Sequence, residues 1–244
     1  MKKVFRDNKI LIGESDISVI DIVEREKHDL RDADLENADL RGADLENAKL
    51  RGADLRGADL ENAKLRGADL RNADLRNANL RGAYLRDADL ENADLRNADL
   101  RNANLRGAYL RYADLRYANF LNANLENANL KQADLRSADL RYADLENANL
   151  ENADLRVANL IGVDLRGANF RYCVGNSKEI KTIQTERWLV VLYKTHIAIG
   201  CEQFSIEQWF NFTDEKIGEF DKHALAFWRK WKPILKNMLK NIIE

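Results

Sequence analysis

Leucine recurs at every fifth position through most of the chain. From Leu30 to Phe170 each fifth residue is Leu or Phe, which gives 29 consecutive units. From Ala33 to Ala168 the residue two places before it is Ala, and Val163 is the one exception. The residue between them is usually Asp or Asn, and the two after Leu are typically Arg or Glu and then Asn or Gly. The repeating unit is therefore A(D/N)L(R/E)(N/G).

This spacing excludes a helix and predicts short strands. Apolar positions separated by two and then three residues drift around a 3.6-residue helix and never form a stripe. Asn, Asp and Gly at this density would also weaken each helical turn. Within a unit, however, Ala and Leu are two residues apart, so both side chains can face inward from a short strand. Because the following Asn or Gly tolerates a positive φ, we expect each unit to form one short side and one corner.

The run of units resembles the pentapeptide-repeat family, and the resemblance covers 141 of 244 residues. It implies a mainly β fold, a right-handed quadrilateral parallel β-helix with about 20 residues per coil and about seven coils. At a strand spacing of roughly 4.8 Å this solenoid would be about 35 Å long. Stacked coils would bury a column of Leu beside a column of Ala. We expect the β-helix to occupy residues 29–172.

Residues 1–28 lack the repeating unit and are expected to cap the first coil. An uncapped coil would present unpaired strand edges, which invite aggregation. The segments KVF and ILI, on either side of Asp7, Asn8 and Lys9, predict a small hairpin. Residues 18–27 then suit a short helix with apolar side chains available to cover the coil.

Residues 173–244 contain no A(D/N)L unit but all four tryptophans, and they predict a small α+β module that caps the β-helix or mediates assembly. β-rich stretches occupy 180–185, 188–195 and 196–203. Helices are expected after Ser205 and Thr213, and a longer one should kink or restart at Pro233. An apolar stripe at helical spacing makes this last helix the candidate capping or homodimer surface: Phe227, Trp228, Trp231, Leu235 and Met238. The module is similar to C-terminal segments of pentapeptide-repeat proteins from bacteria and their phages.

Charges on the predicted faces alternate in sign. Aspartate recurs every 20 residues from Asp34 to Asp154, and arginine recurs alongside it from Arg56 to Arg156. This pattern predicts a solvated ion-pair network rather than a charged docking strip. Five bulky apolar residues depart from the pattern at outward or corner positions and form a candidate interaction patch: Tyr117, Leu121, Tyr142, Val157 and Ile161. Exposed apolar patches mark contacts, here with the chain's own C-terminal segment, a partner or a second copy.

No catalytic, metal-binding or cofactor-binding motif is present, and a filled narrow coil offers no cleft. We therefore expect a non-enzymatic protein-interaction scaffold whose partner the sequence does not identify. The alternative is a DNA mimic that modulates or protects DNA gyrase, as some members of the resembled family do. Residues 29–172 carry 26 acidic and 22 basic side chains, a net of about four negative charges against about 20 on duplex DNA of equal length.

Direct nucleic-acid binding is disfavoured, because the aspartate column cancels the field of the arginines. We expect no membrane partner, since no apolar run reaches the length of a spanning helix and no signal-peptide core is present. The expected location is the cytoplasm of a bacterium or of a phage-infected host.

Overall fold

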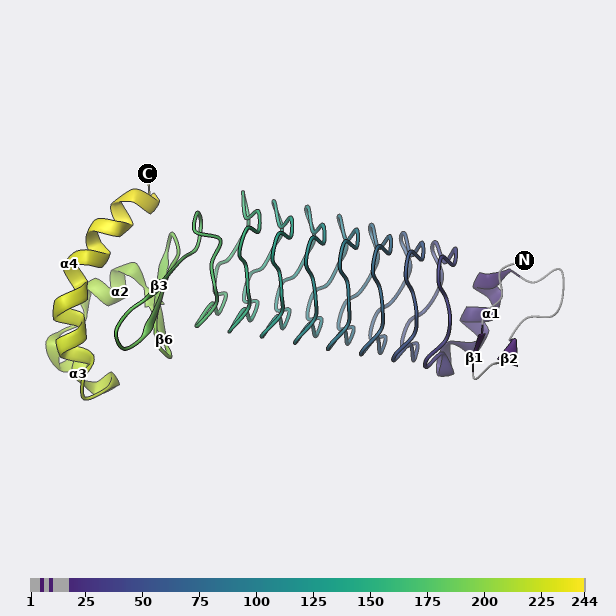
Figure 1. The fold of residues 1–244 in the computed structure, drawn as a ribbon, viewed down its shortest axis with the longest axis horizontal. Helices are drawn as coiled ribbons and strands as arrows, with labels where there is room; N and C mark the ends of the chain where they lie inside the picture. Colours follow the sequence, from purple (N-terminus) through teal and green to yellow (C-terminus); the bar gives the residue numbers. More distant parts are fainter. Residues whose placement is uncertain (1–4, 7–8, 11–17, 244) are drawn as a thin grey trace. The chain divides into compact units, whose positions relative to one another are not determined.

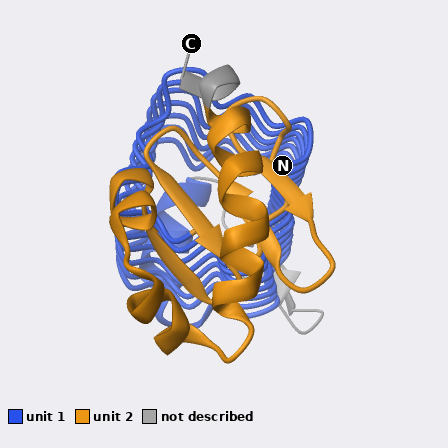
Figure 2. Cartoon of the chain, turned by 90° about the vertical axis from the view of Figure 1, so that its left-hand side faces the viewer, with its two compact units in different colours: residues 1–169 blue, residues 170–244 orange. Residues whose placement is uncertain are grey.

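The computed structural model describes residues 5–6, 9–10 and 18–243. The chain forms two compact units, residues 1–169 and residues 170–244, which are coloured separately in Figure 2. Within the described part of the chain, no helix combines the length and the apolarity needed to cross a bilayer.

The first unit is a β-solenoid whose coils repeat every 20 residues (Figure 1). Isolated parallel bridges join residues 20 apart, from Asp34 with Asp54 to Asn149 with Asn169, in four columns. In a typical bridge, the Leu35 amide donates to the Asp54 carbonyl at 2.7 Å. The Asp54 amide then donates to the carbonyl of Ala33 at 2.9 Å. Each A(D/N)L triplet therefore supplies one short side, as its two inward-facing positions predict.

The solenoid interior consists of the alanine and leucine columns. Every Ala in an alanine position and every Leu in a leucine position from Leu30 to Leu165 is at most 5% exposed. Phe120 fills its leucine position and is fully buried, whereas Val163, in an alanine position, is only partly buried.

Every corner turns through a left-handed residue two places after Leu. Asn or Gly fills most of these corners, because both tolerate a positive φ at little cost. Tyr117, Tyr142 and Val157 fill three others, with φ values of 61°, 56° and 63°. A positive φ is unusual for Tyr and a clear outlier for a β-branched residue.

The N-terminal part of the first unit contains a hairpin and a helix. Strand β1 (Phe5–Arg6) pairs with β2 (Lys9–Ile10), and the rest of the predicted hairpin lies outside the described residues. Helix α1 (Val19–Glu26) begins at a capping box formed by Ser18 and Asp21, and a 3₁₀ turn, η1 (Lys27–Asp29), follows it.

Helix α1 and η1 supply acceptors to the edge of the first coil. In later coils the amide of the residue after each alanine donates to the alanine carbonyl of the preceding coil. Here the Glu24 carboxylate accepts from the Asp44 amide at 2.6 Å, and the Lys27 carbonyl accepts from the Lys49 amide at 2.8 Å. Satisfying these edge donors removes the pairing template that an open coil would offer.

The second unit is a four-stranded antiparallel sheet with three helices (Figure 2). The strands pair in sequence order, β3 (Lys181–Gln184), β4 (Leu189–Leu192), β5 (His196–Ile199) and β6 (Glu202–Ser205). The helices are α2 (Ile206–Asn211), α3 (Asp214–Phe220) and α4 (Ala224–Ile243). Ser205 and Thr213 cap α2 and α3 with their side chains, as predicted.

Two sequence expectations for this unit were wrong. The third β-rich stretch is two strands, because Gly200, at φ 58°, and Cys201 form a two-residue hairpin loop between β5 and β6. Of the two outcomes expected at Pro233, the restart was wrong, because helical structure continues through this residue, and the kink stays a prediction. Proline removes one backbone donor and its ring crowds the preceding turn, but packing of the apolar stripe holds both halves of α4 in one helix.

Candidate interaction surface on the solenoid

Ion pairs cover the side of the solenoid that carries the aspartate column, which confirms the predicted network. Arg96 is representative: its Nε and Nη2 donate to Asp94 at 2.9 and 2.6 Å. The same Nε lies 3.4 Å from Asp114 of the next coil. Each such arginine thus neutralises its own aspartate and approaches the one above it. The hydrogen bond from Arg76 likewise lowers the pKa of the Asp74 carboxyl below its ordinary value.

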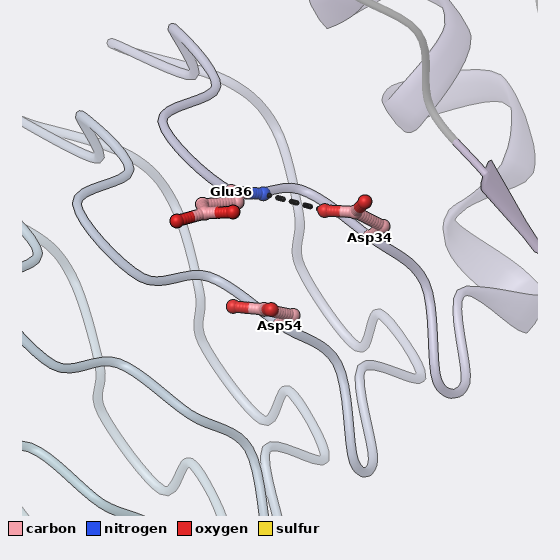
Figure 3. A group of neighbouring side chains, drawn as sticks. All are labelled: Asp34, Glu36 and Asp54. Carbon is pink, nitrogen blue, oxygen red and sulfur yellow. Dashed lines mark hydrogen bonds between the residues drawn. The ribbon is translucent and has the colours of Figure 1, made fainter.

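Acidic groups outnumber bases locally at two places. Asp34, Glu36 and Asp54 bring their carboxylates within 4.8 Å of one another, and Figure 3 shows the Glu36 amide donating to Asp34 at 3.1 Å. Arg56 approaches two of these residues, at 3.3 Å from Glu36 and 2.5 Å from Asp54. The second group, Asp144, Glu146 and Asp164, is approached in the same way by Arg166. These carboxylates are therefore members of the ion-pair network rather than a free ligand set.

The candidate patch occupies two corners of one solenoid side. Tyr117 and Val157 stand at the corner before that side, two coils apart, and Ser137 lies between them in the same column. With Arg116, Arg136 and Arg156 these three residues line an open hollow of about 290 Å³. Tyr117 is 62% exposed and Val157 is 78% exposed, so both apolar side chains flank the hollow in contact with solvent.

The remaining patch residues lie at the corner after the same side. Tyr142 and Ile161 are exposed, and Leu121 is half-buried. The Tyr142 amide donates to the Ile161 carbonyl at 2.9 Å, which places the two residues on adjacent coils. The Tyr142 ring lies over Gly162, where an added Cβ would stand 2.4 Å from Cδ1 of the ring. Only glycine at 162 therefore allows the ring to take this position.

The stripe on α4 lies within the second unit's own core. Phe227, Trp228 and Leu235 are buried against strands β4 and β5, and Trp231 and Met238 pack against them partly exposed. This stripe thus stabilises the unit itself. The sequence offered no way to separate that role from capping or assembly, since each needs the same apolar periodicity.

The model of the family described as pentapeptide repeats matches eight copies, over residues 29–67, 63–102, 103–141 and 133–171. These matches span more than half of the chain. The chain belongs to the pentapeptide-repeat family.

Solved structures of other pentapeptide-repeat proteins are similar over parts of this one. HetL, involved in heterocyst differentiation regulation in Nostoc sp. strain PCC 7120, is 36% identical over 59% of this chain and 76% of its own, with a TM-score of 0.26. Alr5209 from Nostoc PCC 7120 is 38% identical over 39% of this chain and 83% of its own, with a TM-score of 0.35. QnrB1, a plasmid-mediated fluoroquinolone resistance protein, is 25% identical over 57% of this chain and 76% of its own, with a TM-score of 0.27. TM-scores this low support no inference about function, and no curated protein matches the chain.

Proposed function

We propose that this pentapeptide-repeat protein is a non-enzymatic interaction scaffold that binds a protein partner through the patch of Tyr117, Leu121, Tyr142, Val157 and Ile161. In this proposal the solenoid is the right-handed quadrilateral form with about seven coils. The cytoplasmic location, the homodimer and the capping role of residues 173–244 stay predictions.

Backbone strain at the patch is the observation that carries the proposal. Tyr117, Tyr142 and Val157 occupy left-handed corners, a conformation that Asn or Gly adopts in most other coils. A left-handed conformation costs a residue with a Cβ roughly 1–2 kcal/mol, and these side chains are 61–78% exposed. Because these side chains are mostly exposed, their burial stabilises the folded chain by less than the backbone conformation costs. Strain kept at exposed apolar positions supports a role outside the fold, as strained residues cluster at functional sites.

The charged faces of the solenoid are less suited to binding a protein partner than the patch is. Away from the patch, many outward positions carry paired charges, for example Arg71 with Asp69 at 2.6 Å. Paired, exposed charges contribute little binding free energy. The apolar corners, together with the hollow beside Ser137, are therefore the surface best suited to desolvation by a protein partner.

The test compares the proteins that are retained by the wild-type chain, by a triply substituted patch variant and by a doubly substituted control. The patch variant carries Tyr117→Asn, Tyr142→Asn and Val157→Asn. The control carries Tyr84→Asn and Tyr109→Asn, exposed tyrosines in other columns. We expect a partner retained by the wild type and the control to be lost from the patch variant. Equal retention by all three proteins would rule out the patch as the docking surface.

The DNA-mimic alternative receives less support from the charges. The arginine ladder pairs with the aspartates, so the surface lacks the dense negative potential of a duplex, about one charge per 1.7 Å. A gyrase supercoiling assay tests this alternative directly. Protection of gyrase from a quinolone that persists in the patch variant would favour the mimic over the scaffold.

A further inference from the structure

A cavity of about 140 Å³ lies within the second unit. It is bordered by the loop that joins β5 to β6 and by residues of α2, α3 and α4. Cavities of about this size accept one small group; an apolar cavity of about 150 Å³ holds benzene, for instance. Five of the eleven lining residues are aromatic: Trp188, Trp209, Phe220, Phe227 and Trp228.

Ring-to-ring contacts hold the aromatic wall in place. Trp188 meets Phe227 edge to face at 4.9 Å between ring centres, and Trp209 lies 5.3 Å from Trp228. Trp209 is further fixed by its Nε1, which donates to the Ile197 carbonyl at 2.7 Å. A Cβ at Gly200 would stand 3.0 Å from Cδ1 of Trp188, so a larger residue there would press on the indole. A ligand would therefore meet a preorganised wall, which lowers the entropic cost of binding.

Two carboxylates, Glu202 and Asp221, also line the cavity. Neither forms an ion pair with a cationic side chain in the described part of the chain. Asp221 accepts the backbone amide of His223 at 2.8 Å, and Glu202 accepts from the Cys201 thiol at 3.6 Å. No cationic residue contributes to the lining, so the charge of this cavity is negative although the unit carries many lysines.

We propose that this cavity binds a trimethylammonium group, supplied either by a free quaternary amine or by a methylated lysine side chain. Faces of Trp and Phe rings attract cations, and quaternary ammonium groups are bound in such aromatic cages. The same rings already attract cations of the chain: Arg187 lies 5.7 Å from the Trp188 ring and Lys232 lies 5.5 Å from the Trp228 ring. Methylation makes an ammonium larger and easier to dehydrate, which suits a partly open cavity with aromatic rings and two carboxylates in its lining.

Choline and its uncharged carbon isostere, dimethylbutanol, separate cation recognition from simple apolar filling. Both are titrated against the full chain, with sodium chloride matched to the choline chloride. Binding is followed by tryptophan fluorescence and by the alkylation rate of Cys201, which is exposed and lines the cavity while Cys173 is buried. We expect choline to protect Cys201 and to bind roughly tenfold more tightly than the isostere. Equal affinities, or no protection by choline, would overturn the proposal.

Charge-removing variants with unchanged shape locate the interaction. Glu202→Gln and Asp221→Asn should each weaken choline roughly two- to fivefold and leave the isostere unaffected. The matched control is Glu207→Gln, an exposed carboxylate of α2 that does not line the cavity. Unchanged choline affinity in the doubly substituted chain would contradict the proposal. The acetylated amide of trimethyllysine is the last probe: tighter binding than choline identifies a peptide source, and weaker binding identifies a free amine.

Discussion

Replacing Val157 by Asn should stabilise the solenoid, although valine is the more hydrophobic residue. Val157 has a φ of 63° and is 78% exposed. Relief of a left-handed β-branched residue is worth roughly 1–2 kcal/mol. Full burial of valine contributes at most about 3 kcal/mol, and a side chain about one fifth buried keeps well under 1 kcal/mol of that. The net expectation is a free energy of unfolding raised by roughly 1 kcal/mol.

Urea denaturation of the wild type and the variant measures this difference, with hydrogen exchange of the flanking coils as a local probe because solenoids can open locally. Ser137→Asn provides the control in the same column, at φ 60° and without β-branching, and its gain should be smaller. An unchanged or lower stability for Val157→Asn would mean that the valine makes a stabilising contact within the fold. The strain could then not be used to infer a partner.

Three further changes test other parts of the structure. Ala98→Phe should cost on the order of 1–3 kcal/mol in thermal denaturation, because Ala98 is 1% exposed; a neutral result would show that the coil can expand. Gly162→Ala should lose stability and change the Tyr142 signals in NMR, since the new Cβ overlaps the ring and φ is 70°, whereas an unmoved ring would contradict the contact. The lowered pKa of Asp74 stabilises the fold fully above the unfolded value of about 3.9. That contribution is lost as pH falls through the folded pKa. The urea concentration at the unfolding midpoint should therefore decrease when the pH is lowered from about 5 to about 3. The decrease should be smaller in Arg76→Gln.

The solenoid could be predicted from the sequence because its information is local. Each unit carries its own inward pair and its own corner, so residues such as Asp34 and Asp54 meet simply by counting 20 along the chain. The charged columns follow from the same register. For that reason the pairing of Arg96 with Asp94 and its approach to Asp114 could be expected before any coordinates were known.

The second unit required contacts that no period encodes. The hairpin at Gly200 interrupts a continuous β-rich stretch, and Pro233 sits inside a helix that tertiary packing preserves. The aromatic cavity was missed because it combines Trp188 before β4, Glu202 in β6 and Asp221 before α4. The concentration of all four tryptophans after residue 173 was the one available signal, and it does not distinguish a core from a ligand wall.

The interaction patch falls between these two cases, because its positions were predictable and its conformational cost was not. Counting along the repeat identifies Tyr117 and Val157 as corner residues, but only the φ angles show that the corner keeps its left-handed turn instead of rearranging. The hydrogen bond from the Tyr117 amide to the Arg136 carbonyl, at 3.1 Å, explains this. The coil above fixes the backbone of the corner whatever side chain it bears. A solenoid can therefore present almost any side chain at a corner, because the stacking of neighbouring coils offsets the conformational free energy of the left-handed backbone.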